Sequence, residues 1–257
     1  MAPAISIDRP MSLAGRLRIG VRLLLMVLLL IALIPVHYLF ELLTGRSSIP
    51  GRFLGAIAAI AGVHITVYGR KVRRGAFFIA NHVSWIDIPA LAGSTGTAFV
   101  GHDGLASMPA LRWLCALNDT VFVARHDRRS VADQAAQVRE ALDENGALTI
   151  FPEGTTSDGT DLLPFKSALL SAIEPVPPGI EVQPVLLDYE EAPEIAWVGD
   201  DPGLDNFLRI LARKRPVRLA IHFLEPLSGE AATDRKTMAA ASREAIGHAM
   251  KPPATLS

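Results

Sequence analysis

From residue 63 onward the chain alternates between short apolar runs and amphipathic runs, and this alternation limits the fold more than any other feature. Seven runs have the pattern of strands: 63–68, 76–80, 98–100, 120–124, 147–151, 182–187 and 217–223. Six others have the pattern of helices: 86–92, 105–117, 130–144, 165–173, 204–214 and 233–250. Strands that alternate with helices favour a parallel sheet covered on both faces. We therefore expect an α/β fold with a largely parallel sheet flanked by helices.

The composition points toward a membrane and away from nucleic acid. The 257 residues are 50% hydrophobic and their mean hydropathy is +0.31, which is high for a soluble protein of this size. The net charge of −1 provides no basic field that would attract nucleic acid. The single cysteine, Cys115, excludes an intrachain disulfide and is consistent with a reducing compartment.

An uncharged apolar run of 18 residues occupies positions 23–40. As a helix it covers about 27 Å, close to the hydrocarbon thickness of a bilayer. Pro35 and His37 weaken its last third, so the clean apolar part, residues 23–34, is too short to span alone. The run is preceded by arginines, which favours a cytoplasmic N-terminal side: these are Arg9, Arg16, Arg18 and Arg22.

A second apolar stretch, residues 53–67, follows a turn-like segment at residues 45–51. Small residues dominate this stretch, which favours close helix packing. We interpret the two stretches as a membrane helical hairpin that dips into, or lies on, one leaflet. One true crossing and a cleaved signal peptide are the alternatives. The chain is thus divided into a membrane-anchoring segment, residues 1–62, and a second domain, residues 63–257.

The motif NHVSWID, at residues 81–87, follows the expected strand at 76–80. It places His82 and Asp87 at an HxxxxD spacing, with Asp87 near the start of the next helix. A carboxylate there can hold one imidazole nitrogen and leave the other free to take a proton from an alcohol. The alternative is a structural histidine that caps a turn, since a lone HxxxxD pattern is common by chance.

The motif FPEGTTS, at residues 151–157, follows another expected strand. Its proline stiffens the turn, and Gly154 permits close approach of a ligand to the backbone. Thr155 and Thr156 offer hydroxyl and N–H groups beside Glu153. The alternative is an acidic surface loop, but the HxxxxD motif upstream makes a coincidence hard to sustain.

Two basic residues are candidate contacts for an anionic group. Arg125 directly follows an expected strand, where a guanidinium suits a bidentate grip on phosphate. Lys166 would add a second positive charge. Because sites in such folds gather beyond the carboxyl ends of strands, His82, Arg125 and Glu153 are expected at one edge of the sheet.

Four blocks of the sequence, NHVSWID, VFVAR, FPEGTTS and VQPVLL, resemble the motifs of the 1-acylglycerol-3-phosphate acyltransferase superfamily. The similarity covers roughly residues 63–227, and the first and third blocks are quite specific. It implies a glycerolipid acyltransferase-like fold. It also implies transfer of a fatty acyl group from acyl-CoA or acyl carrier protein to a lysolipid hydroxyl. The first acceptor to expect is 1-acylglycerol-3-phosphate, which would give phosphatidic acid.

The resemblance also implies roles for single residues. His82 would be the general base and Asp87 its orienting partner, while Arg125 would contact the acceptor's phosphate. Glu153 and Gly154 would bind the acceptor or shape the site. The remaining candidate binding residues are Thr155, Thr156 and Lys166.

The expected partners are membrane lipids, the lysolipid acceptor and the acyl donor, and no nucleic acid. No metal is expected, because the other histidines have no metal-ligand spacing. No cofactor is expected either, because the acyl donor is a co-substrate. The expected location is a bacterial-type inner (cytoplasmic) membrane, with the catalytic domain on the cytoplasmic side where thioester donors are found.

One departure from the family pattern concerns the acceptor. Many members that use lysophosphatidic acid have arginine where this chain has Thr156, so one phosphate contact is lost. The form FPEGTTSDG and the segment 197–200 are similar to lyso-ornithine lipid acyltransferases, which act on a phosphorus-free aminolipid. That acceptor is the second hypothesis.

Two further classes stay open from the sequence. One is a non-catalytic membrane-anchored lipid-binding module, against which the intact His82, Asp87 and Glu153 argue. The other is a hydrolase in which His82 activates water.

Overall fold

The structure, a computed structural model, describes residues 12–45, 47–102, 120–123, 131–199 and 201–251. Its sheet has seven strands in the order β1-β7-β6-β2-β5-β3-β4. These strands are β1 Val63–Gly69, β2 Ala76–Ala80, β3 Ala98–His102, β4 Val121–Val123, β5 Ala147–Ile150, β6 Glu181–Tyr189 and β7 Val217–Phe223. Only β6 and β7 pair antiparallel within this sheet; the other pairs are parallel. The expected α/β fold with a largely parallel sheet is confirmed.

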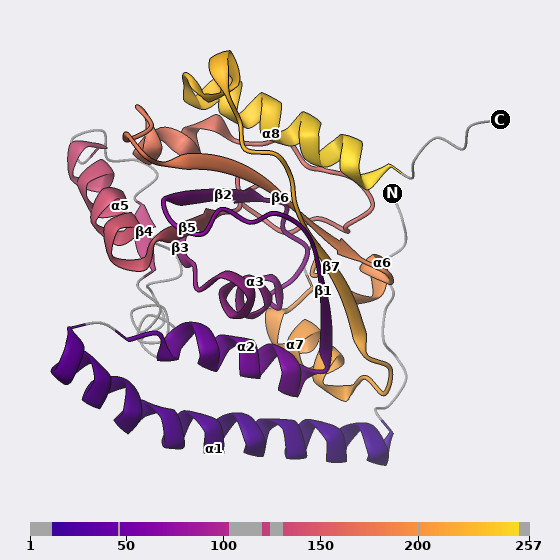
Figure 1. Ribbon diagram of the computed structural model, residues 1–257. Coiled ribbons are helices and arrows are strands. Elements are labelled where there is room, and N and C mark those ends of the chain that lie inside the picture. The colour runs from indigo at the N-terminus through magenta and orange to yellow at the C-terminus, as the bar shows by residue number, and fades with distance from the viewer. Residues whose placement is uncertain (1–11, 46, 103–119, 124–130, 200, 252–257) are drawn as a thin grey trace.

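Helices cover both faces of the sheet (Figure 1). One face carries α1 Leu13–Thr44, α2 Ile49–Ala61, α3 Asp87–Thr95, α6 Ala192–Ile195 and α7 Gly203–Ala212. The other carries α5 Val131–Asn145, the 3₁₀ segments η3 Ser167–Ile173 and η4 Gly229–Ala232, and α8 Arg235–Met250. Separate apolar clusters fill the two layers: Phe78, Leu91 and Ile210 belong to the first, and Phe77, Leu148 and Leu170 to the second.

Three details of the helices differ from the sequence-based expectation or lie outside it. The segment expected as a helix at 165–173 is a 3₁₀ helix, because prolines at 164 and 175 leave room for a short segment only. The short α6 was not expected. The helix expected at 105–117, with Cys115, lies outside the described residues.

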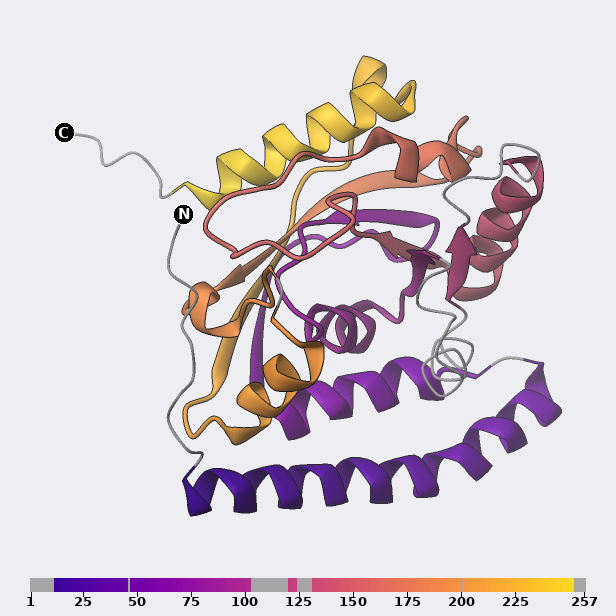
Figure 2. The same ribbon diagram turned by 180° about the vertical axis from the view of Figure 1, so that it is seen from behind.

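The two expected N-terminal helices are present and form a hairpin (Figures 1 and 2). α1 ends at Gly45, whose φ of 68° reverses the chain direction, and α2 then runs back beside α1. α2 packs on α3 through glycines: a Cβ at Gly93 would lie 2.4 Å from Gly55 Cα. This packing joins α2 of the expected anchoring segment to α3 of the expected second domain. The division between residues 62 and 63 therefore stays a prediction.

One face of α1 is apolar and points away from the domain. Leu17, Leu24, Leu28 and Ile31 are 52–69% exposed. Within the described residues, α1 is the one helix whose length and hydropathy would allow it to cross a membrane.

The N-terminal half of α1 is tied to α7 by two of the arginines. Arg18 Nε donates to the carbonyl oxygen of Ala212 at 2.9 Å, and Arg22 Nη1 donates to that of Leu211 at 2.9 Å. These guanidinium groups therefore cap the C-terminus of α7, where carbonyl oxygens lack intrahelical partners.

Candidate active site

The turn after β2 is anchored to β6 by a buried amide. Asn81 Nδ2 donates to the carbonyl oxygen of Leu187 at 3.0 Å, and the Leu187 N–H donates to Asn81 Oδ1 at 2.7 Å. The side chain thereby extends the β2–β6 ladder past Ala80, the last paired residue of β2. The next residue, His82, is placed just beyond the strand end.

His82 and Asp87 form a direct pair. His82 Nδ1 lies 2.7 Å from Asp87 Oδ2, and the imidazole stacks on the Phe151 ring with centroids 4.1 Å apart. His82 Nε2 has no hydrogen-bond partner within the described residues, and 17% of the His82 side chain is exposed. The sequence-predicted orientation, one nitrogen held by a carboxylate and the other free, is the geometry observed.

Asp87 is fully buried at the first position of α3. Its Oδ2 also accepts hydrogen bonds from the backbone N–H groups of Val83 at 2.6 Å and Ser84 at 3.0 Å. Its Oδ1 accepts a hydrogen bond from the Tyr189 hydroxyl. A buried carboxylate is stable when its oxygens are satisfied in this way, and the contacts fix its orientation toward His82.

Glu153 is buried beside this pair rather than on a surface loop. Its Oε1 accepts a hydrogen bond from the backbone N–H of His82 at 2.9 Å, and its Oε2 accepts one from the backbone N–H of Leu163 at 3.0 Å. Burial raises the pKa of Glu153 above its ordinary value, although the two N–H donors act in the opposite direction. Both oxygens are occupied by backbone, so the geometry favours shaping of the site over direct contact with an acceptor.

The FPEGTTS turn wraps around the same point. Gly154 has a φ of 67°, and a Cβ there would lie 3.1 Å from Lys166 Nζ, so the ammonium group lies over this turn. Thr155 is exposed, whereas the Thr156 hydroxyl donates to the carbonyl oxygen of Trp197. The Ser157 N–H donates to the His82 carbonyl oxygen at 2.8 Å and joins the two motifs.

The structure brings together most of the residues predicted from sequence. The set assembled at one sheet edge comprises His82, Asp87, Glu153, Gly154, Thr155, Thr156 and Lys166. Arg125 lies outside the described residues. The requirement for a metal or cofactor is not tested by this geometry, and the expectation of none stays a prediction.

Two residues of this network were missed by sequence reasoning. Tyr189 ends β6, and Asn206 lies in α7, where its Oδ1 accepts the Ser84 hydroxyl at 3.2 Å and its Nδ2 donates to the Ala196 carbonyl at 2.9 Å. Tyr189 lies 102 residues from Asp87 in the sequence, and Asn206 lies 122 residues from Ser84.

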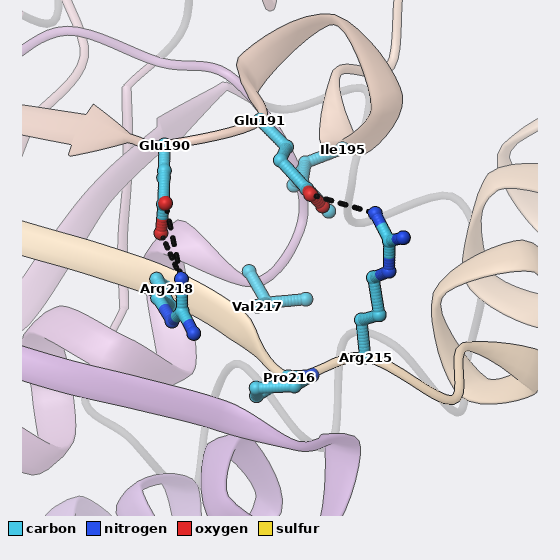
Figure 3. Close-up of a pocket in the computed structure, with 7 residues that line it drawn as sticks. All are labelled: Glu190, Glu191, Ile195, Arg215, Pro216, Val217 and Arg218. Carbon is cyan, nitrogen blue, oxygen red and sulfur yellow. Dashed lines mark hydrogen bonds and ion pairs between the residues drawn. The ribbon is translucent and has the colours of Figure 1, made fainter.

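A hollow of about 290 Å³ lies near the end of β6 and the start of β7 (Figure 3). It is lined by Glu190, Glu191, Ile195, Arg215, Pro216, Val217 and Arg218. Arg218 pairs with Glu190 at 2.8 Å, and Arg215 lies 3.5 Å from Glu191. Its charges are paired and no predicted site residue lines it, so it is separate from the His82 site.

The fold and the His82–Asp87 site define a class, the acyltransferases. Residues 64–188 match the family model described as Acyltransferase. The chain belongs to this acyltransferase family, and it is an acyltransferase.

Several relatives share most of the chain. A lyso-ornithine lipid O-acyltransferase from Rhodobacter capsulatus is 31% identical over 95% of this chain and 94% of that protein. Its namesake from Brucella abortus is 32% identical over 88% and 91%. A 1-acyl-sn-glycerol-3-phosphate acyltransferase from Neisseria gonorrhoeae is 36% identical over 52% of each chain.

The fold is also that of a solved structure. The 1-acyl-sn-glycerophosphate (LPA) acyltransferase PlsC from Thermotoga maritima has a TM-score of 0.59 and 20% identity, over 90% of this chain and 96% of that one. The bacterial lipid acyltransferases among the relatives, together with the apolar α1, indicate membrane association.

Proposed function

We propose that the protein transfers a fatty acyl group from acyl-CoA or acyl carrier protein to the free hydroxyl of a lysolipid, with His82 as the general base. The observation that carries the proposal is the 2.7 Å contact between His82 Nδ1 and an Asp87 carboxylate whose oxygens are all engaged. That contact holds the ring so that Nε2 is the nitrogen available to an acceptor.

The reaction is a direct transfer. His82 Nε2 removes the hydroxyl proton while the hydroxyl oxygen attacks the thioester carbonyl carbon. The tetrahedral oxyanion then collapses, the carbon–sulfur bond breaks, and the thiolate leaves with the acyl group now esterified to the acceptor. The imidazolium returns its proton to the thiolate, and Asp87 stabilises the positive charge in between.

Lyso-ornithine lipid is the acceptor that we place first. The relatives with this activity align over nearly the whole chain, and Thr156, which takes the position of a phosphate-binding arginine, donates its hydroxyl to the Trp197 carbonyl. An acceptor without phosphorus does not require that guanidinium.

The second candidate acceptor is 1-acylglycerol-3-phosphate, which the sequence analysis put first. The Neisseria relative supports it through 36% identity over half the chain. Lys166, whose ammonium group lies over Gly154, would supply a cation for the phosphate.

We place the catalytic domain on the cytoplasmic side of a bacterial inner membrane, because thioester donors are found there. The exposed apolar face of α1 and the position of α2 between α1 and α3 support a hairpin held in one leaflet.

The test is an acyl-transfer assay on membranes that contain the protein. Labelled acyl-CoA and labelled acyl carrier protein are each offered with lyso-ornithine lipid and with lysophosphatidic acid. His82→Ala should lower kcat by about 100-fold or more, the range for loss of a general base. His64→Ala, an exposed histidine of β1, is the matched control and should retain full activity.

The products distinguish the candidates. Ornithine lipid supports the first acceptor, and phosphatidic acid supports the second. Free fatty acid formed equally with and without lysolipid would indicate a hydrolase, and substantial transfer by His82→Ala would contradict the proposed base.

A further inference from the structure

Tyr189 is a buried polar residue that the chemistry above does not use. It is the last residue of β6, and its hydroxyl donates to Asp87 Oδ1, whereas His82 contacts the other carboxylate oxygen, Oδ2. We propose that Tyr189 is a positioning residue that acts on His82 through Asp87, holding the carboxylate in place and sharing its negative charge. This inference rests on the proposed role of His82 as the base.

The contact is built from elements far apart in sequence. β2 delivers His82 and β6 delivers Tyr189 from adjacent parallel strands, with Ala80 paired to Val185, while α3 contributes Asp87 between them. Tyr189 is 4% exposed and Asp87 is fully buried, so water does not compete for this hydrogen bond. Charge-assisted hydrogen bonds of this kind are short and strong.

Tyr189 acts as a donor throughout the working pH range. Burial, with the neighbouring Asp87 carboxylate, raises the pKa of the Tyr189 hydroxyl well above its ordinary value. The phenol therefore keeps its proton, and among the residues that the structure describes, Asp87 Oδ1 is its acceptor.

Removal of the hydroxyl has two consequences for His82. Asp87 Oδ1 becomes a buried acceptor without a partner, so the carboxylate loses one of the contacts that fix its rotation. More of the negative charge then falls on Oδ2, the oxygen that faces the imidazole. A stronger anion at 2.7 Å favours the imidazolium, so a higher pH is needed to free the base.

Two other ionisable groups near His82, Glu153 and Lys166, can be distinguished from Tyr189 by the pH dependence of a Tyr189 variant. Glu153 accepts the His82 backbone N–H, and Lys166 lies over the neighbouring Gly154. Within the described residues Tyr189 bonds to neither, so a pH effect that originates from Glu153 or Lys166 would remain in a Tyr189 variant.

The experiment compares Tyr189→Phe with the wild-type protein in kcat and KM for acyl transfer across pH. Phenylalanine keeps the ring and removes the hydroxyl alone. We expect kcat to fall about tenfold, KM for the acceptor to stay unchanged, and the acid limb of the kcat profile to move to higher pH. Tyr68→Phe, on the half-exposed ring of β1 that stacks on His222, is the matched control.

The position of the acid limb does not depend on how much of the variant folds, so reduced stability does not obscure the result. An unchanged limb together with an unchanged kcat would overturn the role of Tyr189. His82→Ala and Asp87→Asn in the same series separate this from the proposed function. If His82→Ala remains active the base itself is wrong, whereas an inactive His82→Ala beside an unaffected Tyr189→Phe refutes Tyr189 alone.

Discussion

Two buried carboxylates, Asp87 and Glu153, accept hydrogen bonds from His82, and their surroundings give them different properties. Asp87 receives backbone, imidazole and phenol contacts on both oxygens and lies at the first position of α3, where the helix dipole favours an anion. Glu153 receives two backbone N–H groups, yet burial still raises its pKa. Asp87 is therefore suited to orient a base, and Glu153 to hold the two motifs together.

The raised pKa of Glu153 makes a contribution to stability that depends on pH. Its folded-state pKa lies above its ordinary value of 4.5, so the folded protein binds this proton more tightly than the unfolded chain does. The contribution is full below pH 4.5 and is lost as the pH rises through the folded value. Relative to Glu153→Gln, the wild-type protein should thus become less stable between pH 4 and pH 8.

Urea unfolding in detergent micelles across that range measures the difference. The wild-type advantage over Glu153→Gln should shrink with rising pH, and an advantage that grows would contradict the assigned burial effect. Glu244→Gln, at an exposed position of α8, is the matched control and should show no such trend.

At the scale of elements, α7 connects α1 to the turn that carries His82. Arg22 of α1 donates a hydrogen bond to the Leu211 carbonyl at the C-terminus of α7. Asn206, near the middle of α7, accepts one from the hydroxyl of Ser84, which lies between His82 and Asp87 in the HxxxxD motif. The backbone N–H of Trp197 donates to the Val83 carbonyl, in the same motif, at 3.0 Å. These hydrogen bonds form a continuous series of contacts from α1 through α7 to the turn that carries His82.

The α2–α3 contact depends on glycine at its closest point. Gly93→Ala would place a methyl group 2.4 Å from Gly55 Cα, so the helices must separate, at a cost of about 1–3 kcal/mol in the free energy of unfolding. Gly20→Ala in α1 has nothing within 4 Å and should stabilise slightly, because alanine favours a helix.

Thermal or urea unfolding of both variants tests this contact. If Gly93→Ala matched Gly20→Ala in stability, the close approach of the two helices would be wrong.

At the scale of the molecule, we expect the exposed apolar face of α1 to be the membrane-binding surface. Leu24→Asp with Ile31→Asp puts two charges on that face, and we expect the protein to leave the membrane fraction because charges are costly in the acyl region. The matched control, Ala240→Asp with Ala249→Asp, adds the same charge to the exposed face of α8.

Vesicle co-sedimentation checks the result. Retention of the α1 variant at the level of the α8 variant would show that this face is not what binds the bilayer.

Sequence reasoning found the strands and the two motifs because both are local. Apolar runs such as 76–80 and 217–223 are strands with the predicted bounds, and His82 and Asp87 are five residues apart. The reversal of β7 was not predicted, since an apolar run has the same composition in either direction. Tyr189 and Asn206 were not predicted because their partners are brought close only by the tertiary fold.

The antiparallel direction of β7 determines the side from which the chain enters the sheet after the helical hairpin. β1 is parallel to β7, and β7 runs antiparallel to β6, so Val63, the residue that begins β1 after the helical hairpin, lies near the end of β6. The chain therefore enters the sheet on the carboxyl side of β2 and β6, the side on which His82 follows β2. In the proposed reaction, a lysolipid that diffuses in the plane of the leaflet would reach His82 by a two-dimensional search.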